Sequence, residues 1–83
     1  MTMRQVDRVC RLLALTIYDV RQHPTPEGEA EVAHLRRRLI DLGVAVNVGR
    51  VSAVQAAPLW LALEQDILRC RAQVHSSRRV SSG

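Results

Sequence analysis

Phenylalanine and lysine are both absent from this 83-residue sequence, which also contains only one tyrosine, Tyr18, and one tryptophan, Trp60. With so few rings, the core must be built from aliphatic side chains. Single-stranded nucleic acids are bound on several exposed aromatic side chains, so the composition strongly disfavours a protein of that class. The lack of lysine is typical of codon bias in a GC-rich genome and by itself indicates nothing about function.

The charge balance does not fit a dedicated binder of the phosphate backbone. All twelve basic residues are arginine and stand against eight acidic ones, which gives a formal net charge of +4. Arg78 and Arg79 lie close to the end of the sequence, so the rest carries ten arginines against eight acids, or +2. Proteins that bind nucleic acid through its phosphates concentrate more basic charge than this on one face.

Cysteine and histidine are too scattered to suggest a metal site. Cys10 and Cys70 have no CxxC partner and no metal-ligand spacing to His23, His34 or His75. We therefore expect no metal and no cofactor, and we expect both thiols to be buried on helix faces. A disulfide between them requires the two helices to pack in matching register.

The sequence offers no constellation for catalysis. Glu64 and Asp66 are two residues apart on an expected helix, so their carboxylates point to different faces. The other acidic residues cluster at a helix start, where negative charge suits the helix dipole. The glycines are isolated and do not form a phosphate-binding loop. We expect no enzymatic activity.

No segment is suited to cross or enter a membrane. The longest uncharged runs are residues 12–18 and 51–63, both too short to span a bilayer. The N-terminal residues lack the basic segment and apolar core of a signal peptide. We expect a cytoplasmic protein that makes no membrane contact.

Apolar residues recur at helical spacing in three segments, which predicts an all-α fold. We expect helices over 3–21, 26–42 and 53–74, packed as a three-helix antiparallel bundle. They form a single domain over 1–75, followed by a Ser/Arg/Gly-rich tail over 76–83. The expected apolar faces are Met3, Val6, Cys10, Leu13, Ile17 and Val20 in the first helix, Val32, Leu35, Leu39 and Leu42 in the second, and Trp60, Leu63, Ile67, Cys70 and Val74, widened by Leu59 and Leu68, in the third.

Capping signals support these helix boundaries. Thr2 and Ser52 each precede a glutamine by three residues, which is the spacing of a capping box. Thr25 is suited to cap the second helix, because a proline follows at the first helical position. Gly43 follows Leu42 and is the expected C′ residue of that helix.

The valine-rich segment 44–49 is ambiguous. Three valines alternate with small or polar residues, a pattern that favours a short strand. Because a single strand is not stable alone, the segment is either an extended connector over the core or a strand paired with its copy in a dimer.

The first helix has more apolar surface than one core needs. A second stripe of Val9, Leu12 and Leu15, with Tyr18 near its end, lies beside the first face. Exposed apolar stripes mark interaction sites, and short chains gain stability from oligomers. We therefore expect a homodimer whose interface is formed by these four residues. In the alternative, the valine-rich connector covers the stripe within one chain.

Three successive arginines are the one concentrated charge feature. Arg37 and Arg38 are spaced to pair with Asp41 on the same helix. Arg36 and Arg37, together with Arg50, are our candidate residues for binding an acidic surface on a protein partner. Guanidinium groups are enriched at the energetic centres of protein interfaces.

These features predict a small non-enzymatic protein-binding module, an adaptor or inhibitor that docks on a host protein as a helical homodimer. Short, lysine-free chains without a catalytic site are common in phages and mobile elements of GC-rich bacteria, and we interpret this chain as one of that kind.

The alternative function is a DNA-binding transcriptional regulator. Residues 39–54 resemble the turn region of the helix-turn-helix in small bacterial and phage DNA-binding domains. The valine-rich insert is too long for the standard turn. The expected DNA-contacting helix offers few base-recognising side chains, only Asn47, Arg50 and Gln55.

Overall fold

The computed structural model describes residues 3–82, with side chains described over 4–76. Three helices make up this part of the chain: α1 (Met3–Gln22), α2 (Pro26–Asn47) and α3 (Ala53–Ser82). Each helix packs against the other two, and no strand occurs within residues 3–82. The prediction of an all-α bundle of three helices is confirmed.

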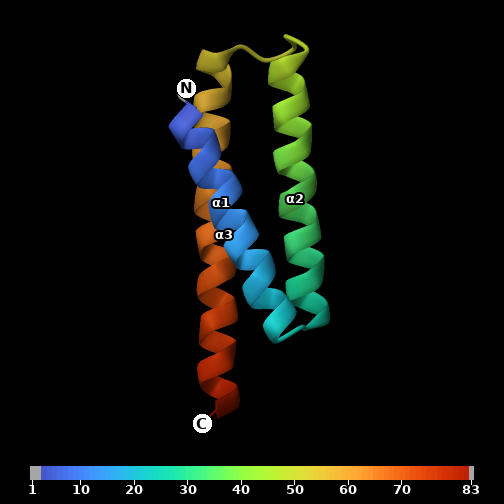
Figure 1. Cartoon of the computed structure of the whole chain (residues 1–83), viewed down its shortest axis with the longest axis vertical. Helices are drawn as coiled ribbons and strands as arrows, with labels where there is room; N and C mark the ends of the chain where they lie inside the picture. Colours follow the sequence, from blue (N-terminus) through green and yellow to red (C-terminus); the bar gives the residue numbers. More distant parts are fainter. Residues whose placement is uncertain (1–2, 83) are drawn as a thin grey trace.

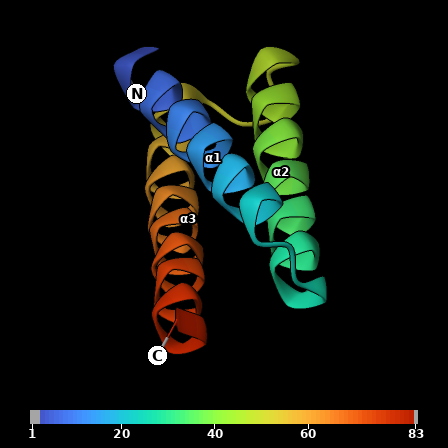
Figure 2. The ribbon, with the colours of Figure 1, turned by 60° about the horizontal axis from the view of Figure 1, so that its bottom comes forward.

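The helices alternate in direction along the chain (Figure 1). α2 and α3 lie side by side and antiparallel, and α1 crosses diagonally over this pair. The N-terminal end of α1 lies beside the start of α3, and its C-terminal end lies beside the start of α2 (Figure 2). α1 and α3 therefore run in the same direction.

Two helices begin at the predicted capping residues. The hydroxyl of Thr25 accepts a hydrogen bond from the Gly28 N–H at 3.0 Å, and the proline after Thr25 opens α2. At the start of α3, the Gln55 N–H donates to the Ser52 hydroxyl at 3.1 Å, and the Ser52 N–H donates to the Gln55 side-chain oxygen at 3.0 Å. These bonds satisfy N–H groups that a helix start otherwise leaves unpaired. The third predicted cap, Thr2, lies outside the described residues.

α2 is longer than predicted, because most of the valine-rich segment is helical and is neither a strand nor an extended connector. The helix passes through Gly43 and ends where Gly49 adopts a φ of 81°. There the Gly49 N–H donates to the Val46 carbonyl at 3.2 Å, and the Arg50 N–H donates to the Ala45 carbonyl at 2.9 Å. This pair of bonds is the glycine-terminated end of a Schellman motif. The C′ residue is therefore Gly49 and not Gly43.

The apolar face of α2 explains why the helix continues past Gly43. Ala45 is buried and Val46 packs against the core, so the face that begins at Val32 keeps its helical spacing beyond the glycine. A glycine inside a helix costs about 0.5–1 kcal/mol relative to alanine. Each buried methyl or methylene group contributes about 0.8 kcal/mol, and beyond Gly43 the helix buries Ala45 and part of Val46. Burial therefore outweighs the weak helix preference at Gly43.

α3 begins before its proline and extends well past the predicted end at residue 74. Pro58 lies inside the helix, where its missing N–H leaves the carbonyl of Val54 without a helical donor. Val54 is 81% exposed, so this first turn is open to water. The helical backbone continues to Ser82. Most side chains of the predicted tail over 76–83 lie outside the described residues, and the tail stays a prediction.

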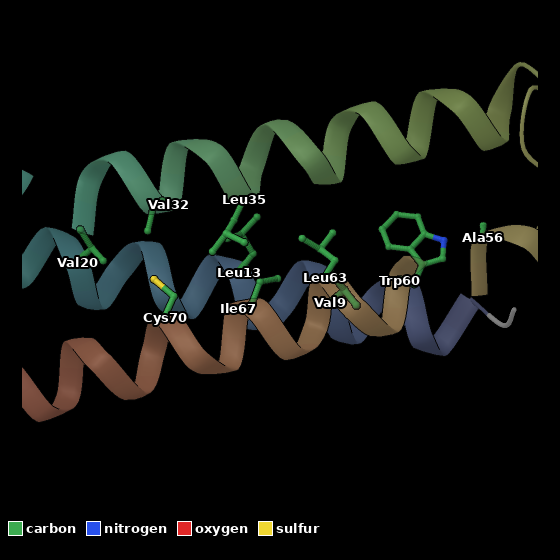
Figure 3. Close-up of a cluster of buried hydrophobic side chains, with 10 residues drawn as sticks. All are labelled: Val9, Leu13, Val20, Val32, Leu35, Ala56, Trp60, Leu63, Ile67 and Cys70. Carbon is green, nitrogen blue, oxygen red and sulfur yellow. The ribbon is translucent and has the colours of Figure 1, made fainter. Parts of the chain in front are cut away.

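The core is aliphatic except for one ring (Figure 3). Leu35, Leu63 and Ile67 are among its most deeply buried side chains, and Trp60 adds the indole. The predicted faces of α2 and α3 are confirmed. Leu59 and Leu68 are about half exposed and do not widen the α3 face as predicted. The buried apolar cluster consists of Val9, Leu13, Val20, Val32, Leu35, Ala56, Trp60, Leu63, Ile67 and Cys70.

The indole of Trp60 stabilises the core through the apolar area that it buries and not through a hydrogen bond. Its Nε1 is buried and has no acceptor within the described part of the chain. An unpaired buried donor costs about 1–3 kcal/mol. An aromatic side chain buries about 150–250 Å², and at about 25 cal/mol per Å² this stabilises by more than the unpaired donor costs.

α1 buries most of its predicted face, since Leu13 and Val20 are in the core and Val6 and Ile17 pack against it. Cys10, expected in the core, is exposed, while Thr16 is fully buried. Thr16 fits there because its hydroxyl donates to the Leu12 carbonyl at 2.7 Å. Val9 is also fully buried in the core of its own chain, which corrects its assignment to an exposed dimer stripe. The buried side chains of α1 are Val9, Leu13, Thr16 and Val20.

Residues 39–54 do not adopt the geometry of a helix-turn-helix. α2 passes without a break through the predicted turn at Gly43. The two helices of that motif meet at about 90–120°, whereas α2 and α3 lie antiparallel and side by side (Figure 1).

Replacing Gly43 and Gly49 separately by alanine should change stability in opposite directions. No described atom lies within 4 Å of a Cβ added at Gly43, and α2 is continuous there. Gly43→Ala should therefore raise the free energy of unfolding by about 0.5–1 kcal/mol. At Gly49 the positive φ disfavours a Cβ, so Gly49→Ala should lower the free energy of unfolding by about 1–2 kcal/mol. Urea denaturation followed by circular dichroism measures both, and changes of the same sign would mean that α2 does not end at Gly49.

Candidate protein-docking surface

The three successive arginines of α2 have three different environments. Arg38 faces α3, where its guanidinium lies 2.6 Å from the Asp66 carboxylate in a partly buried ion pair. Arg37 lies 3.6 Å from Asp41 on its own helix, as predicted, and both side chains are largely exposed. Arg36 is exposed and forms no ion pair or hydrogen bond with the side chains described over 4–76. Arg36 and Arg37 are therefore more available to another molecule than Arg38, which is ion-paired and only partly exposed.

Exposed aliphatic side chains continue this outer face of α2. Ile40 and Val44 follow Arg36 at intervals of four residues, which places them on one side of the helix. Each is about half exposed, and Val48, the next residue on this line, is more exposed still. We call the set Arg36, Arg37, Ile40, Val44 and Val48 the docking face.

Arg50, the third predicted partner-binding residue, lies apart from this cluster. Its side chain is exposed, but it follows the end of α2, where its N–H closes the helix. Asn47, the last residue of α2, comes ten residues after Arg37, which is roughly 15 Å along the helix axis at 1.5 Å per residue. The structure brings Arg36 and Arg37 together and does not bring Arg50 to them.

The predicted dimer stripe of α1 is reduced to its outer residues. Val9 is in the core, and Leu12 is partly buried against it. Leu15 is 44% exposed and Tyr18 is 62% exposed. With Val9 in the core and Leu12 partly buried, the exposed side chains that remain of the predicted stripe are Leu15 and Tyr18.

Acidic side chains between the helices are held by basic partners. Glu64 of α3 is nearly buried and lies 2.8 Å from the Arg8 guanidinium of α1. Asp19 of α1 lies 3.5 Å from Arg71 and 3.1 Å from His75 of α3. These pairs fix the register of α1 along α3. Within residues 3–82, no group of three or more His, Cys, Asp or Glu side chains is placed to hold a metal ion.

The two cysteines differ in their surroundings. Both are free thiols; Cys10 is exposed on α1, whereas Cys70 is buried on α3. Burial raises the pKa of the Cys70 thiol, and the nearby carboxylate of Glu31 raises it further. The prediction of a buried thiol is therefore confirmed for Cys70 and wrong for Cys10, which sits beside the buried edge of α1.

Comparisons with known proteins do not place this chain in a family. No family model, no curated protein and no solved structure matches it. In the described part of the chain, no helix combines the length and apolar character needed to cross a membrane.

The native protein should show one fast and one slow thiol. A bulky thiol reagent should modify Cys10 quickly, because its side chain is exposed. Cys70 should react slowly, because burial blocks access and its raised pKa lowers the thiolate fraction at any given pH.

The variant Cys10→Ser is the control for this measurement, because it should remove the fast phase and leave the slow one. In denaturant, which abolishes the burial of Cys70, both thiols of the wild type should react at similar rates. Two equally fast thiols in the native protein would contradict the packing of α3.

Proposed function

We propose that this chain is a small non-enzymatic protein-binding module, an adaptor or inhibitor. It docks through the outer face of α2 on a protein that offers an acidic surface with an apolar centre, and it acts as a homodimer.

The docking face is supported by a comparison of the ion-pair partners of the arginines. Three arginines form ion pairs with an acidic residue of another helix: Arg8, Arg38 and Arg71. Arg36 has no partner among the described side chains, and Arg37 pairs only with Asp41 of its own helix, at 3.6 Å and with both side chains largely exposed. Two arginines without strong internal partners stand beside exposed aliphatic side chains on one helix face.

This combination favours a protein partner. Arginine forms strong, often bidentate bonds with carboxylates, and it is enriched where interfaces concentrate their binding energy. Ile40 and Val44 supply the apolar surface that a helix lays into a groove of its partner. The same helix begins with Glu27 and Glu29, which repel phosphates, so α2 is less suited to a nucleic-acid backbone.

The carboxylates support a module without catalysis. Glu64 and Asp19 are the acidic residues of the described ion pairs between α1 and α3. Each pairs with an arginine of the neighbouring helix. They join α1 to α3.

Charge reversal on the docking face tests the proposal. Arg36→Glu combined with Arg37→Glu should weaken partner binding at least about tenfold, because a single truncated hot-spot residue costs about 2 kcal/mol or more. Stability should change by no more than about 0.5 kcal/mol, since both side chains are on the surface. The measurement is quantitative mass spectrometry of proteins retained from lysate of the source cells by wild-type and variant chains.

The matched control is Arg4→Glu with Arg11→Glu, which makes the same change in net charge on exposed positions of α1. A partner retained by the wild type and by this control, but lost with the Arg36/Arg37 variant, supports the docking face. Ile40→Glu with Val44→Glu should lose the same partner. Equal retention by all variants would contradict the proposal. A salt-sensitive retention of DNA that only the Arg36/Arg37 variant loses would replace the protein partner by nucleic acid.

A further inference from the structure

We draw no further inference here: the strongest candidate, the exposed apolar line of Val54, Leu61 and Leu68 on the outward side of α3, is an unpartnered helix face, and nothing in the structure shows what covers it.

Discussion

The buried face of α3 is the constraint on which the rest of the structure depends. Trp60, Leu63, Ile67 and Cys70 form one edge of this helix, and both α1 and α2 pack against it. Most buried apolar side chains of the described residues belong to one cluster, so the fold of this short chain depends on that core. Side chains on the outer faces of the helices are not needed for this core and can therefore contact another molecule.

Ion pairs then decide which charges are left for a partner. Arg8 with Glu64, and Arg38 with Asp66, join α3 to its two neighbours. Arg38 is adjacent in sequence to Arg37, yet one lies between helices and the other points outward. The difference follows from about 100° of rotation per residue, so three successive arginines cannot share one environment. The docking face consists of side chains that belong neither to the core nor to the ion pairs between helices.

The sequence predicted most of the buried faces of all three helices, and its error on α1 concerns Cys10, Val9 and Thr16. Leu13 and Val20 are buried as predicted, but Cys10 is exposed while Val9 and Thr16 are buried. α1 is apolar on two sides around Leu13, so sequence spacing does not distinguish the edge with Cys10 from the edge with Val9 and Thr16. Thr16 can be buried because its hydroxyl donates to the Leu12 carbonyl. The exposed pair Ile40 and Val44 was missed for a similar reason: composition does not show which side of an apolar helix faces water.

Local sequence alone determined the helix starts and the helical class. Thr25 and Ser52 form the expected capping bonds with residues three positions away, which requires no tertiary contact. The end of α2 was decided by tertiary structure. Gly43 and Gly49 both follow apolar residues, and only the packing of Ala45 and Val46 carries the helix past the first to the second. The same holds for the functional surfaces, because a side chain is exposed or buried only with respect to helices that lie far away in sequence.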